Sequence, residues 1–329
     1  MKIRTLGQGL EVSAIGLGCM ALTTQNYGSV DEAESIRTLH SALDRGITLL
    51  DTAETYGQDH ANERLLGRGL KGRREQAVIA TKFGLKFDPS DTSLVVDGNP
   101  KGIRKALEGS LRRLETEYID IYFQHRLDPN VPVEEVWAVL ADLVQEGKVR
   151  HLGLSEPDLD SLRKAHAIHP VTVVENEYSL FTRTPEGFIL PALEELGIGM
   201  MCYAPIGRGF LTGAITSPED FAEGDFRSSL PRFQGENFYR NLELVDRIRA
   251  AAQARGATPA QLALAWLLAR GPSLVPIPGM EKVSFLEENL GALDLDLSEA
   301  EIESMDSGIS QGAFGERYPE SFSRYSGKK

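Results

Sequence analysis

The sequence has few cysteines, no long apolar run and no basic block. It has only two cysteines, Cys19 and Cys202, among 329 residues, which excludes a disulfide framework and favours a reducing compartment. The longest unbroken apolar run, residues 262–269, is too short to cross a bilayer, and the first residues (MKIRTLGQGLEVS) lack the apolar core of a signal peptide. A net charge of −13 disfavours nucleic acid and anionic membranes as partners. These absences predict a cytoplasmic protein without a nucleic-acid or membrane partner.

Short apolar runs alternate with longer amphipathic segments along almost the whole chain. Strand and helix alternation predicts a parallel sheet, and runs that are apolar throughout predict strands buried on both faces. Several helical patterns begin at a polar cap and end near Gly46, Gly147 or Gly197. Eight such units favour an α/β fold, a closed (β/α)8 TIM barrel that forms one domain over residues 1–329. The expected strands are residues 14–18, 47–51, 77–82, 119–125, 149–156, 171–176, 198–205 and 273–279.

Three segments fall outside this repeat. The first seventeen residues predict two short strands that turn at residues 7–9, an N-terminal β-hairpin that covers the barrel floor. Residues 84–100 and 211–236 predict long irregular loops at the carboxyl face of the barrel, where long loops are often functional.

The run GLGCMA, residues 16–21, has the spacing of a dinucleotide-binding fingerprint and follows an expected strand. That fingerprint works only when a helix begins at the glycines and directs its N-terminus at the pyrophosphate. Nine residues (LTTQNYGSV) separate it from the helical pattern that begins near Asp31. We therefore do not expect a Rossmann dehydrogenase.

Polar residues stand at the end of most expected strands. In an α/β barrel the catalytic groups come from the carboxyl ends of the strands, so these side chains should meet at one mouth. Each of them taken singly has an ordinary structural explanation, but their convergence favours a catalytic site. The residues at these strand ends are Asp51, Lys82, His125, Ser155, Glu156, Glu175, Asn176 and Tyr203.

A phenol has a pKa near 10 and is a poor proton donor at neutral pH. A neighbouring ammonium group lowers that pKa, and a carboxylate in turn keeps the ammonium group charged and in place. A histidine nearby can orient a carbonyl oxygen by a hydrogen bond. Asp51, Tyr56, Lys82 and His125 together therefore indicate a proton-donor site for carbonyl reduction.

These residues and their surroundings resemble the aldo-keto reductases, in particular the bacterial branch similar to pyridoxal reductase and to potassium-channel β-subunits. The resemblance covers nearly the whole chain through DTAETYG, NERLLGRGL, IATKFG, IDIYFQHRLDP, EGKVRHLGLSE, YSLFTR, YAPIGRGFLTG and IPGMEKVSFLEENL, in the family's order. It implies a catalytic tetrad of Asp51, Tyr56, Lys82 and His125. Tyr56 would be the general acid, Lys82 with Asp51 would lower its pKa, and His125 would orient the substrate.

The resemblance also implies where a nicotinamide cofactor would bind. Ser155 and its neighbour would hold the carboxamide, Tyr203 would stack on the ring, and residues 205–213 would lie along the pyrophosphate. The cofactor-binding residues expected on this basis are Ser155, Glu156, Glu175, Tyr203, Pro205, Ile206, Gly207, Arg208, Gly209, Leu211, Gly279, Met280, Lys282, Glu288 and Asn289.

The chain departs from the family pattern at three places. Glu156 stands where an asparagine is usual, and Glu175 where a glutamine is usual, and an ionised carboxylate can only accept hydrogen bonds. Basic residues usually follow the last strand, where this chain has Met280, Glu281, Lys282 and Phe285. NADP(H) is the first expectation on family grounds. NAD(H), or use of both, is the alternative because Glu281 would repel a 2′-phosphate and Phe285 replaces a basic residue.

The expected activity is reduction of aldehydes or ketones, with a small aldehyde, ketone or sugar as substrate. Apolar pocket walls are expected from Tyr27, Phe87, Phe210 and Phe314. Three alternatives remain: a cofactor-sensing binding protein with negligible turnover, an NAD(H)-preferring alcohol or sugar dehydrogenase, and an isomerase or lyase that forms a Schiff base on Lys82.

No metal site is expected, since His166 and His169 lack a third ligand nearby. The sequence indicates no oligomeric state.

Overall fold

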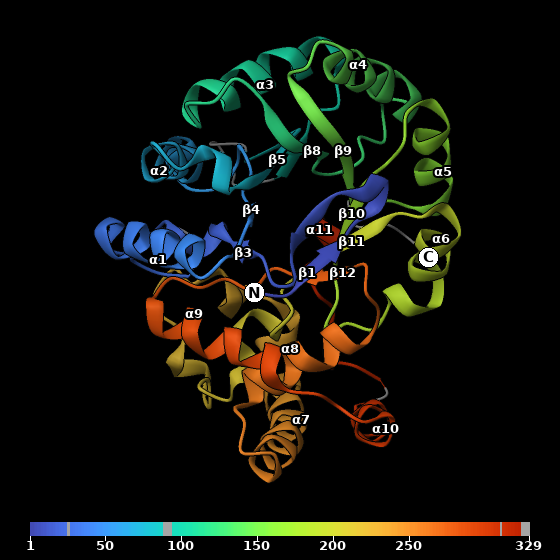
Figure 1. Cartoon of the computed structure of the whole chain (residues 1–329). Coiled ribbons are helices and arrows are strands. Elements are labelled where there is room, and N and C mark those ends of the chain that lie inside the picture. Colours follow the sequence, from blue (N-terminus) through green and yellow to red (C-terminus); the bar gives the residue numbers. More distant parts are fainter. Residues whose placement is uncertain (25–26, 88–93, 310, 324–329) are drawn as a thin grey trace.

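Eight parallel strands form the centre of the molecule (Figure 1). The structure is a computed structural model that describes residues 1–24, 27–87, 94–309 and 311–323. Neighbours in the sheet follow the order of the chain, as consecutive βα units require. The strands, in sheet order, are β3 (Leu17–Gly18), β4 (Leu49–Asp51), β5 (Val78–Phe83), β8 (Ile119–Gln124), β9 (Val149–Ser155), β10 (Val173–Glu177), β11 (Gly199–Tyr203) and β12 (Leu274–Pro276).

The sheet closes on itself between its first and last strands. A parallel bridge joins Gly18 to Gly279, and the Gly18 amide donates to the Pro278 carbonyl oxygen at 2.9 Å. A Cβ atom at Gly18 would lie 2.7 Å from the Ile277 carbonyl oxygen, so only glycine allows the two strands to approach this closely. The expected barrel is therefore confirmed.

Helices connect the strands and surround the barrel (Figure 1). The helix α1 begins after Asp31, whose side chain accepts from the Ala33 amide at 2.9 Å. Only a 3-10 turn, Cys19–Leu22, follows β3 directly, so the glycines of the apparent dinucleotide fingerprint do not open an α-helix. The helices are α1 (Glu32–Asp44), α2 (Ala61–Gly69), α3 (Pro100–Arg113), α4 (Val133–Gln145), α5 (Leu159–Ile168), α6 (Pro185–Leu196), α7 (Gly235–Ala254), α8 (Pro259–Ala269), α9 (Val283–Leu290), α10 (Glu299–Gly308) and α11 (Glu320–Ser323).

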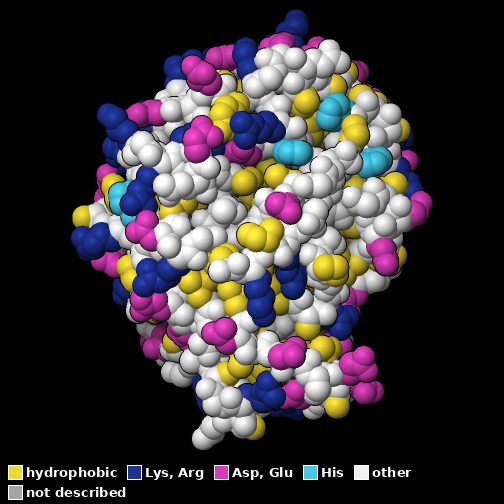
Figure 2. All heavy atoms as spheres, in the orientation of Figure 1, with side chains coloured by type: hydrophobic (Ala, Val, Ile, Leu, Met, Phe, Trp, Pro, Cys, Tyr) yellow, Lys and Arg dark blue, Asp and Glu magenta, His cyan; other side chains and the backbone are white. Residues whose placement is uncertain are grey.

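The N-terminal hairpin covers one end of the barrel, as expected. Strands β1 (Ile3–Thr5) and β2 (Glu11–Ser13) pair antiparallel across a turn at Gly7–Gly9. Leu6 and Val12 are buried against the apolar side chains that fill the barrel interior. Figure 1 views the molecule from this end, and Figure 2 shows basic and acidic side chains interspersed over the same face. The hairpin thus leaves the opposite, carboxyl end of the barrel as the place for a site.

The two insertions differ from each other. Residues 84–100, expected to be irregular, instead contain an antiparallel pair, β6 (Leu85–Phe87) and β7 (Leu94–Val96). These two strands pair only with each other and form a small sheet outside the barrel repeat, so the alternation of strands and helices did not indicate them. Residues 211–236 are irregular as expected and contain three short 3-10 turns, Pro218–Asp220, Phe226–Ser229 and Pro231–Phe233.

Within the described residues, no helix combines the length and the hydropathy that crossing a membrane requires.

Candidate active site

An ion pair and a phenol lie together where β4 and β5 end. Lys82 is fully buried, and its Nζ lies 2.5 Å from Asp51 Oδ1. It also donates to the Thr52 carbonyl oxygen at 3.0 Å and to the Tyr56 hydroxyl oxygen at 3.4 Å. Because β4 and β5 are parallel neighbours, their last residues meet at the same edge of the barrel. The structure thus brings together three of the four residues expected to form the tetrad.

A second carboxyl group faces the same ammonium group. Glu175, on β10 and almost fully buried, lies 3.3 Å from Lys82 Nζ. Burial, with a further contribution from the Asp51 charge, raises the pKa of Glu175 to about 8. Burial works to lower the pKa of Lys82, but the charges of Asp51 and Glu175 outweigh it and raise that pKa. Lys82 is therefore a cation, and Glu175 carries a proton at neutral pH.

The surroundings of Tyr56 act on its pKa in both directions. Burial raises the pKa of Tyr56, and this exceeds the opposing effect of the Lys82 charge; Asp51 and Glu175 raise it further. The Lys82 charge lowers the pKa of Tyr56, as expected, but burial and the carboxyl groups, which the expectation did not include, have the larger effect. Tyr56 is thus a protonated phenol, the form in which it can donate.

His125 lies beside the phenol, directly after β8. Its ring centroid is 6.0 Å from that of Tyr56, with the ring planes at 82°. Burial, together with the charges of Arg126 and Lys82, holds the pKa of His125 well below its usual value. A neutral imidazole can donate one hydrogen bond, and here it is placed beside the proton donor.

A cavity of about 1230 Å³ opens above these residues at the carboxyl end of the barrel. Pockets for small ligands usually measure about 300–1,000 Å³, so this one has room for a dinucleotide and a small substrate together. Of the residues expected in the site, the lining includes Asp51, Tyr56, His125, Glu175, Tyr203, Pro205, Ile206, Arg208, Gly209, Gly279, Glu288 and Asn289. The others are not lining residues: Lys82, Ser155, Glu156, Gly207, Leu211, Met280 and Lys282.

The expected apolar walls are only partly correct. Tyr27 lines the cavity, and Met20, Leu85 and Phe322 add apolar surface to it. Phe210 is fully buried and stacks on Phe233 at 5.1 Å between ring centroids. Phe314 packs against Arg240, whose guanidinium carbon lies 3.6 Å from the centroid of the Phe314 ring. The side chain of Phe87 lies outside the described part of the chain.

Glu156 is engaged by the C-terminal segment. Its two carboxylate oxygens accept from Arg317 at 2.7 and 2.8 Å, and one of them also accepts from the Tyr203 hydroxyl at 2.9 Å. Burial works against this charge, but Arg317 and Arg126 hold the pKa of Glu156 below its ordinary value. Glu156 is therefore ionised, and both of its carboxylate oxygens already accept hydrogen bonds from the protein. These bonds explain why a carboxylate is tolerated at this position.

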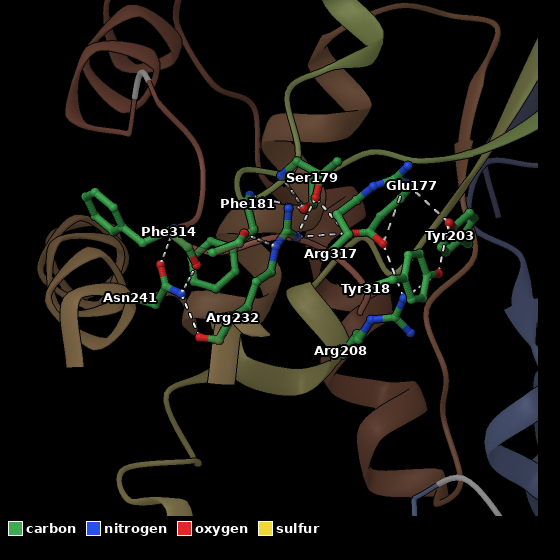
Figure 3. A network of polar contacts seen from close by, with 12 residues as sticks. Glu177, Ser179, Phe181, Tyr203, Arg208, Arg232, Asn241, Phe314, Arg317 and Tyr318 are labelled. Carbon is green, nitrogen blue, oxygen red and sulfur yellow. Dashed lines mark hydrogen bonds and ion pairs between the residues drawn. The ribbon is translucent and has the colours of Figure 1, made fainter. Parts of the chain in front are cut away.

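Glu177, at the end of β10, joins the C-terminal segment to two loops (Figure 3). It forms ion pairs with Arg208 at 3.2 Å, Arg232 at 2.9 Å and Arg317 at 3.9 Å. Burial would raise the pKa of Glu177, but these three arginines lower it to about 2. Arg208 also donates to the Tyr318 hydroxyl at 2.7 Å. The network fixes residues 317–318 over the cavity.

The far end of the cavity is formed by the connection from β12 to α9. Glu281, Phe285, Glu288 and Asn289 line it, whereas Lys282 does not. The Lys282 ammonium group instead lies 5.6 Å from the ring centroid of Phe285. The end of the cavity that should receive an adenosine therefore presents an acidic group.

Sequence reasoning missed four polar residues of this region: Arg126, Glu177, Arg317 and Tyr318. Arg126 directly follows His125 in the motif IDIYFQHRLDP, so its position next to a strand end was a usable signal. The pairing of Arg317 with Glu156 joins residues 161 positions apart, and nothing local in the sequence indicates it.

Comparison with known proteins identifies the family. The sequence profile of the Aldo/keto reductase family matches residues 14–309. The chain belongs to this family. As an aldo-keto reductase it is an oxidoreductase, and the barrel, the hairpin and the strand-end residues are consistent with that class.

Two relatives of this aldo-keto reductase align with almost its whole length. The aldo-keto reductase yakc [NADP(+)] of Schizosaccharomyces pombe is 45% identical over 314 residues, 94% of this chain and 92% of the relative. A probable aldo-keto reductase 1 of Glycine max is 44% identical and covers 98% and 92% of the two chains.

Solved structures show the same fold. The glycerol dehydrogenase of Gluconobacter oxydans superposes with a TM-score of 0.85 at 30% identity, over 97% of this chain and 98% of that one. An aldo/keto reductase of Klebsiella pneumoniae in complex with NADP and acetate has a TM-score of 0.73 at 27% identity, over 97% and 99%.

Proposed function

We propose that this aldo-keto reductase uses NADP(H) to reduce small aldehydes or ketones to alcohols, with Tyr56 as the general acid. The observation that carries the proposal is the position of the Tyr56 hydroxyl. It lies 3.4 Å from the buried Lys82 ammonium group and lines the same cavity as His125. The residues 1–329 would act as one cytoplasmic domain with small molecules as its partners.

Each polar group has a distinct task in this proposal. The neutral His125 donates a hydrogen bond to the substrate's carbonyl oxygen and so orients the carbonyl group. Tyr56 gives its proton to that oxygen as negative charge develops there. Lys82, kept charged by Asp51, stabilises the resulting phenolate. In the reverse direction the phenolate of Tyr56 takes the proton of the alcohol.

The residues present fit a nicotinamide dinucleotide. The cavity is continuous from Tyr56 and His125 to Glu288 and Asn289, and Pro205, Ile206, Arg208 and Gly209 line it between these ends. Bound reduced nicotinamide would supply the hydride. Tyr203, Arg208, Glu288 and Asn289 line the cavity and are the groups proposed to hold the cofactor, whereas Ser155, expected there from the resemblance, lies outside the lining. NADP(H) is favoured by the NADP(+) of the yeast relative's name and the NADP complex of the Klebsiella structure.

Tyr56→Phe tests the proposal directly. Oxidation of NADPH is followed by absorbance with 4-nitrobenzaldehyde or phenanthrenequinone. We expect kcat to fall by roughly 10²- to 10⁴-fold, since the general acid is removed. Cofactor affinity, measured by fluorescence quenching, should change by less than about threefold because the phenol is placed to act on the substrate.

Tyr239→Phe, the same change at an exposed tyrosine of α7, is the matched control and should leave kcat unchanged. Near-normal turnover in Tyr56→Phe would overturn the role of Tyr56. A wild-type protein that binds cofactor tightly but oxidises none with a wide panel of carbonyl compounds would favour the sensor alternative.

A further inference from the structure

Arg126 is a buried cation in the cavity, and no carboxylate of the described residues is paired with it. Its side chain is 4% exposed, and it lines the cavity beside His125. None of the described Asp or Glu residues forms an ion pair with it. Glu156, whose charge reaches Arg126, is already held by both amino groups of Arg317. An unpaired buried charge is unfavourable unless a ligand completes it.

One side of the guanidinium group donates to protein oxygens, whereas the other side has no acceptor among the described residues. The Nη1 amino group donates to the His125 carbonyl oxygen at 2.6 Å and to Ser155 Oγ at 2.8 Å. The buried Nε–H has no partner among the described residues, and none of them bonds to Nη2. Nε and Nη2 form the edge of an arginine that binds the two oxygens of a carboxylate side by side.

Arg126 adds positive charge beside a network in which arginines already outnumber carboxylates. Three guanidinium groups (Arg208, Arg232 and Arg317) pair with Glu156 and Glu177, and the Arg126 charge also acts on Glu156. This contrasts with the net charge of −13 of the whole chain. Figure 3 shows three of these arginines gathered about Glu177, so the local excess is a property of a built network.

The position of Arg126 in the chain places its charge near the expected substrate rather than near the cofactor phosphates. Arg126 directly follows His125, the residue proposed to hold the reacting carbonyl oxygen, and consecutive Cα atoms are about 3.8 Å apart. The Phe322 ring lies 5.9 Å from the guanidinium carbon and covers it on the side of the C-terminal segment. Such an apolar cover strengthens a charge-assisted hydrogen bond. The loop proposed to hold the cofactor pyrophosphate, by contrast, follows β11.

We infer that Arg126 binds a carboxylate of the substrate, so that the preferred substrates are aldehydes or ketones that also carry a carboxylate group, such as oxo acids and semialdehyde acids. The inference rests on the proposed carbonyl reduction. The carbonyl oxygen is held by Tyr56 and His125, while the free edge of Arg126 receives the carboxylate. No proton or electron transfer is added to the reaction.

The test compares two substrates of similar size with NADPH, 4-carboxybenzaldehyde and the neutral 4-nitrobenzaldehyde. We expect kcat/KM of the wild type to favour the carboxylate, chiefly through a lower KM. Arg126→Met removes the charge but keeps most of the side-chain volume. It should lower the ratio of the two kcat/KM values by roughly 10- to 100-fold, as loss of a buried charge-assisted hydrogen bond requires.

The ratio is used because Arg126 also contacts Ser155, and a disturbance of that contact would affect both substrates alike. Arg126→Lys keeps the positive charge but lacks the pair of N–H donors at Nε and Nη2. This variant should therefore recover part of the lost preference for the carboxylate substrate. A wild type that prefers the neutral aldehyde, or an Arg126→Met variant with an unchanged ratio, would overturn the inference and leave the reductase proposal intact.

A ligand-binding measurement tests the same inference without requiring turnover. The unreactive 4-carbamoylbenzoate should stabilise the wild type in a thermal-shift titration more than neutral terephthalamide does. Arg126→Met should abolish this difference. Equal shifts by the two compounds in the wild type would overturn the inference. Absence of reduction with every carbonyl compound, in contrast, would count against the proposed function only.

Discussion

Two carboxyl groups, Asp51 and Glu175, share one buried ammonium group, and this arrangement makes Glu175 the most unusual residue of the site. Asp51 holds Lys82 at 2.5 Å and Glu175 lies at 3.3 Å. A neutral Glu175 can donate as well as accept a hydrogen bond, as the glutamine usual in relatives can. The protonated form thus explains how a glutamate is tolerated beside the proton donor.

Glu175→Gln should make stability less dependent on pH. The pKa of Glu175 is about 8 in the folded chain against an ordinary 4.5. Between these values the folded chain keeps a proton that the unfolded chain has released, so wild-type stability falls as pH rises. We expect the variant to gain on the wild type between pH 5 and 9, by on the order of a few kcal/mol.

Urea unfolding of both proteins at pH 5, 7 and 9 measures this difference. The exposed Glu223 provides the control, and Glu223→Gln should show no difference that grows with pH. A constant offset between Glu175→Gln and the wild type at all three pH values would contradict the raised pKa.

At the scale of elements, we expect the connection from β12 to α9 to influence the choice between NADPH and NADH. Glu281 lines the cavity there and Lys282 does not, although both stand where relatives usually carry basic residues. Glu281 is partly exposed, so water and salt weaken its effect on a bound phosphate. We therefore expect this acidic group to reduce the preference for NADPH without requiring NADH.

Glu281→Arg should therefore raise kcat/KM for NADPH by roughly 3- to 10-fold, because a repulsive charge becomes an attractive one. The value for NADH should stay within about twofold. Steady-state rates with both cofactors measure this, and Glu287→Arg is the matched control because Glu287 is on α9 but outside the cavity lining. Equal changes for NADPH and NADH would show that Glu281 does not face the 2′-phosphate.

At the scale of the whole molecule, the two ends of the barrel differ in character: one is packed with apolar side chains, and the other carries the polar site. The hairpin end is filled by apolar packing that includes Leu6 and Val12, whereas the polar site occupies the carboxyl end. A Cβ atom at Gly7 would lie 2.3 Å from the Thr172 carbonyl oxygen, so the hairpin is seated tightly on the barrel. Stability and chemistry should respond to different substitutions.

Leu6→Ala should lower the free energy of unfolding by about 2–4 kcal/mol, since it leaves a cavity under the hairpin. Its KM for an aldehyde should match that of the wild type. Ile3→Ala on the same hairpin is the control, because Ile3 is 55% exposed and its loss should cost less than about 0.5 kcal/mol. Urea unfolding and initial rates measure both effects, and an altered KM in Leu6→Ala would contradict the separation.

Features that depend on neighbours close in the sequence could be predicted from the sequence by itself. The alternation of apolar runs and helical patterns determined the barrel, the turn at Gly7–Gly9 determined the hairpin, and the last residues of the strands located Asp51, Lys82 and His125. Such features follow from periodicity and from the parallel direction of the strands. The pair β6 and β7 was missed because it forms a two-stranded sheet of its own, outside the repeat of strands and helices from which the barrel was predicted.

Only the tertiary structure decided the electrostatics of the site. The partner of Glu156 is Arg317, and Glu177 pairs with arginines from two loops and the C-terminal segment. The pKa of Tyr56 rises rather than falls because burial and two carboxyl groups outweigh one ammonium group. Coulomb energies and desolvation depend on distances between side chains and on the surrounding dielectric. Both are set by residues far apart in the chain, which the fold alone brings together.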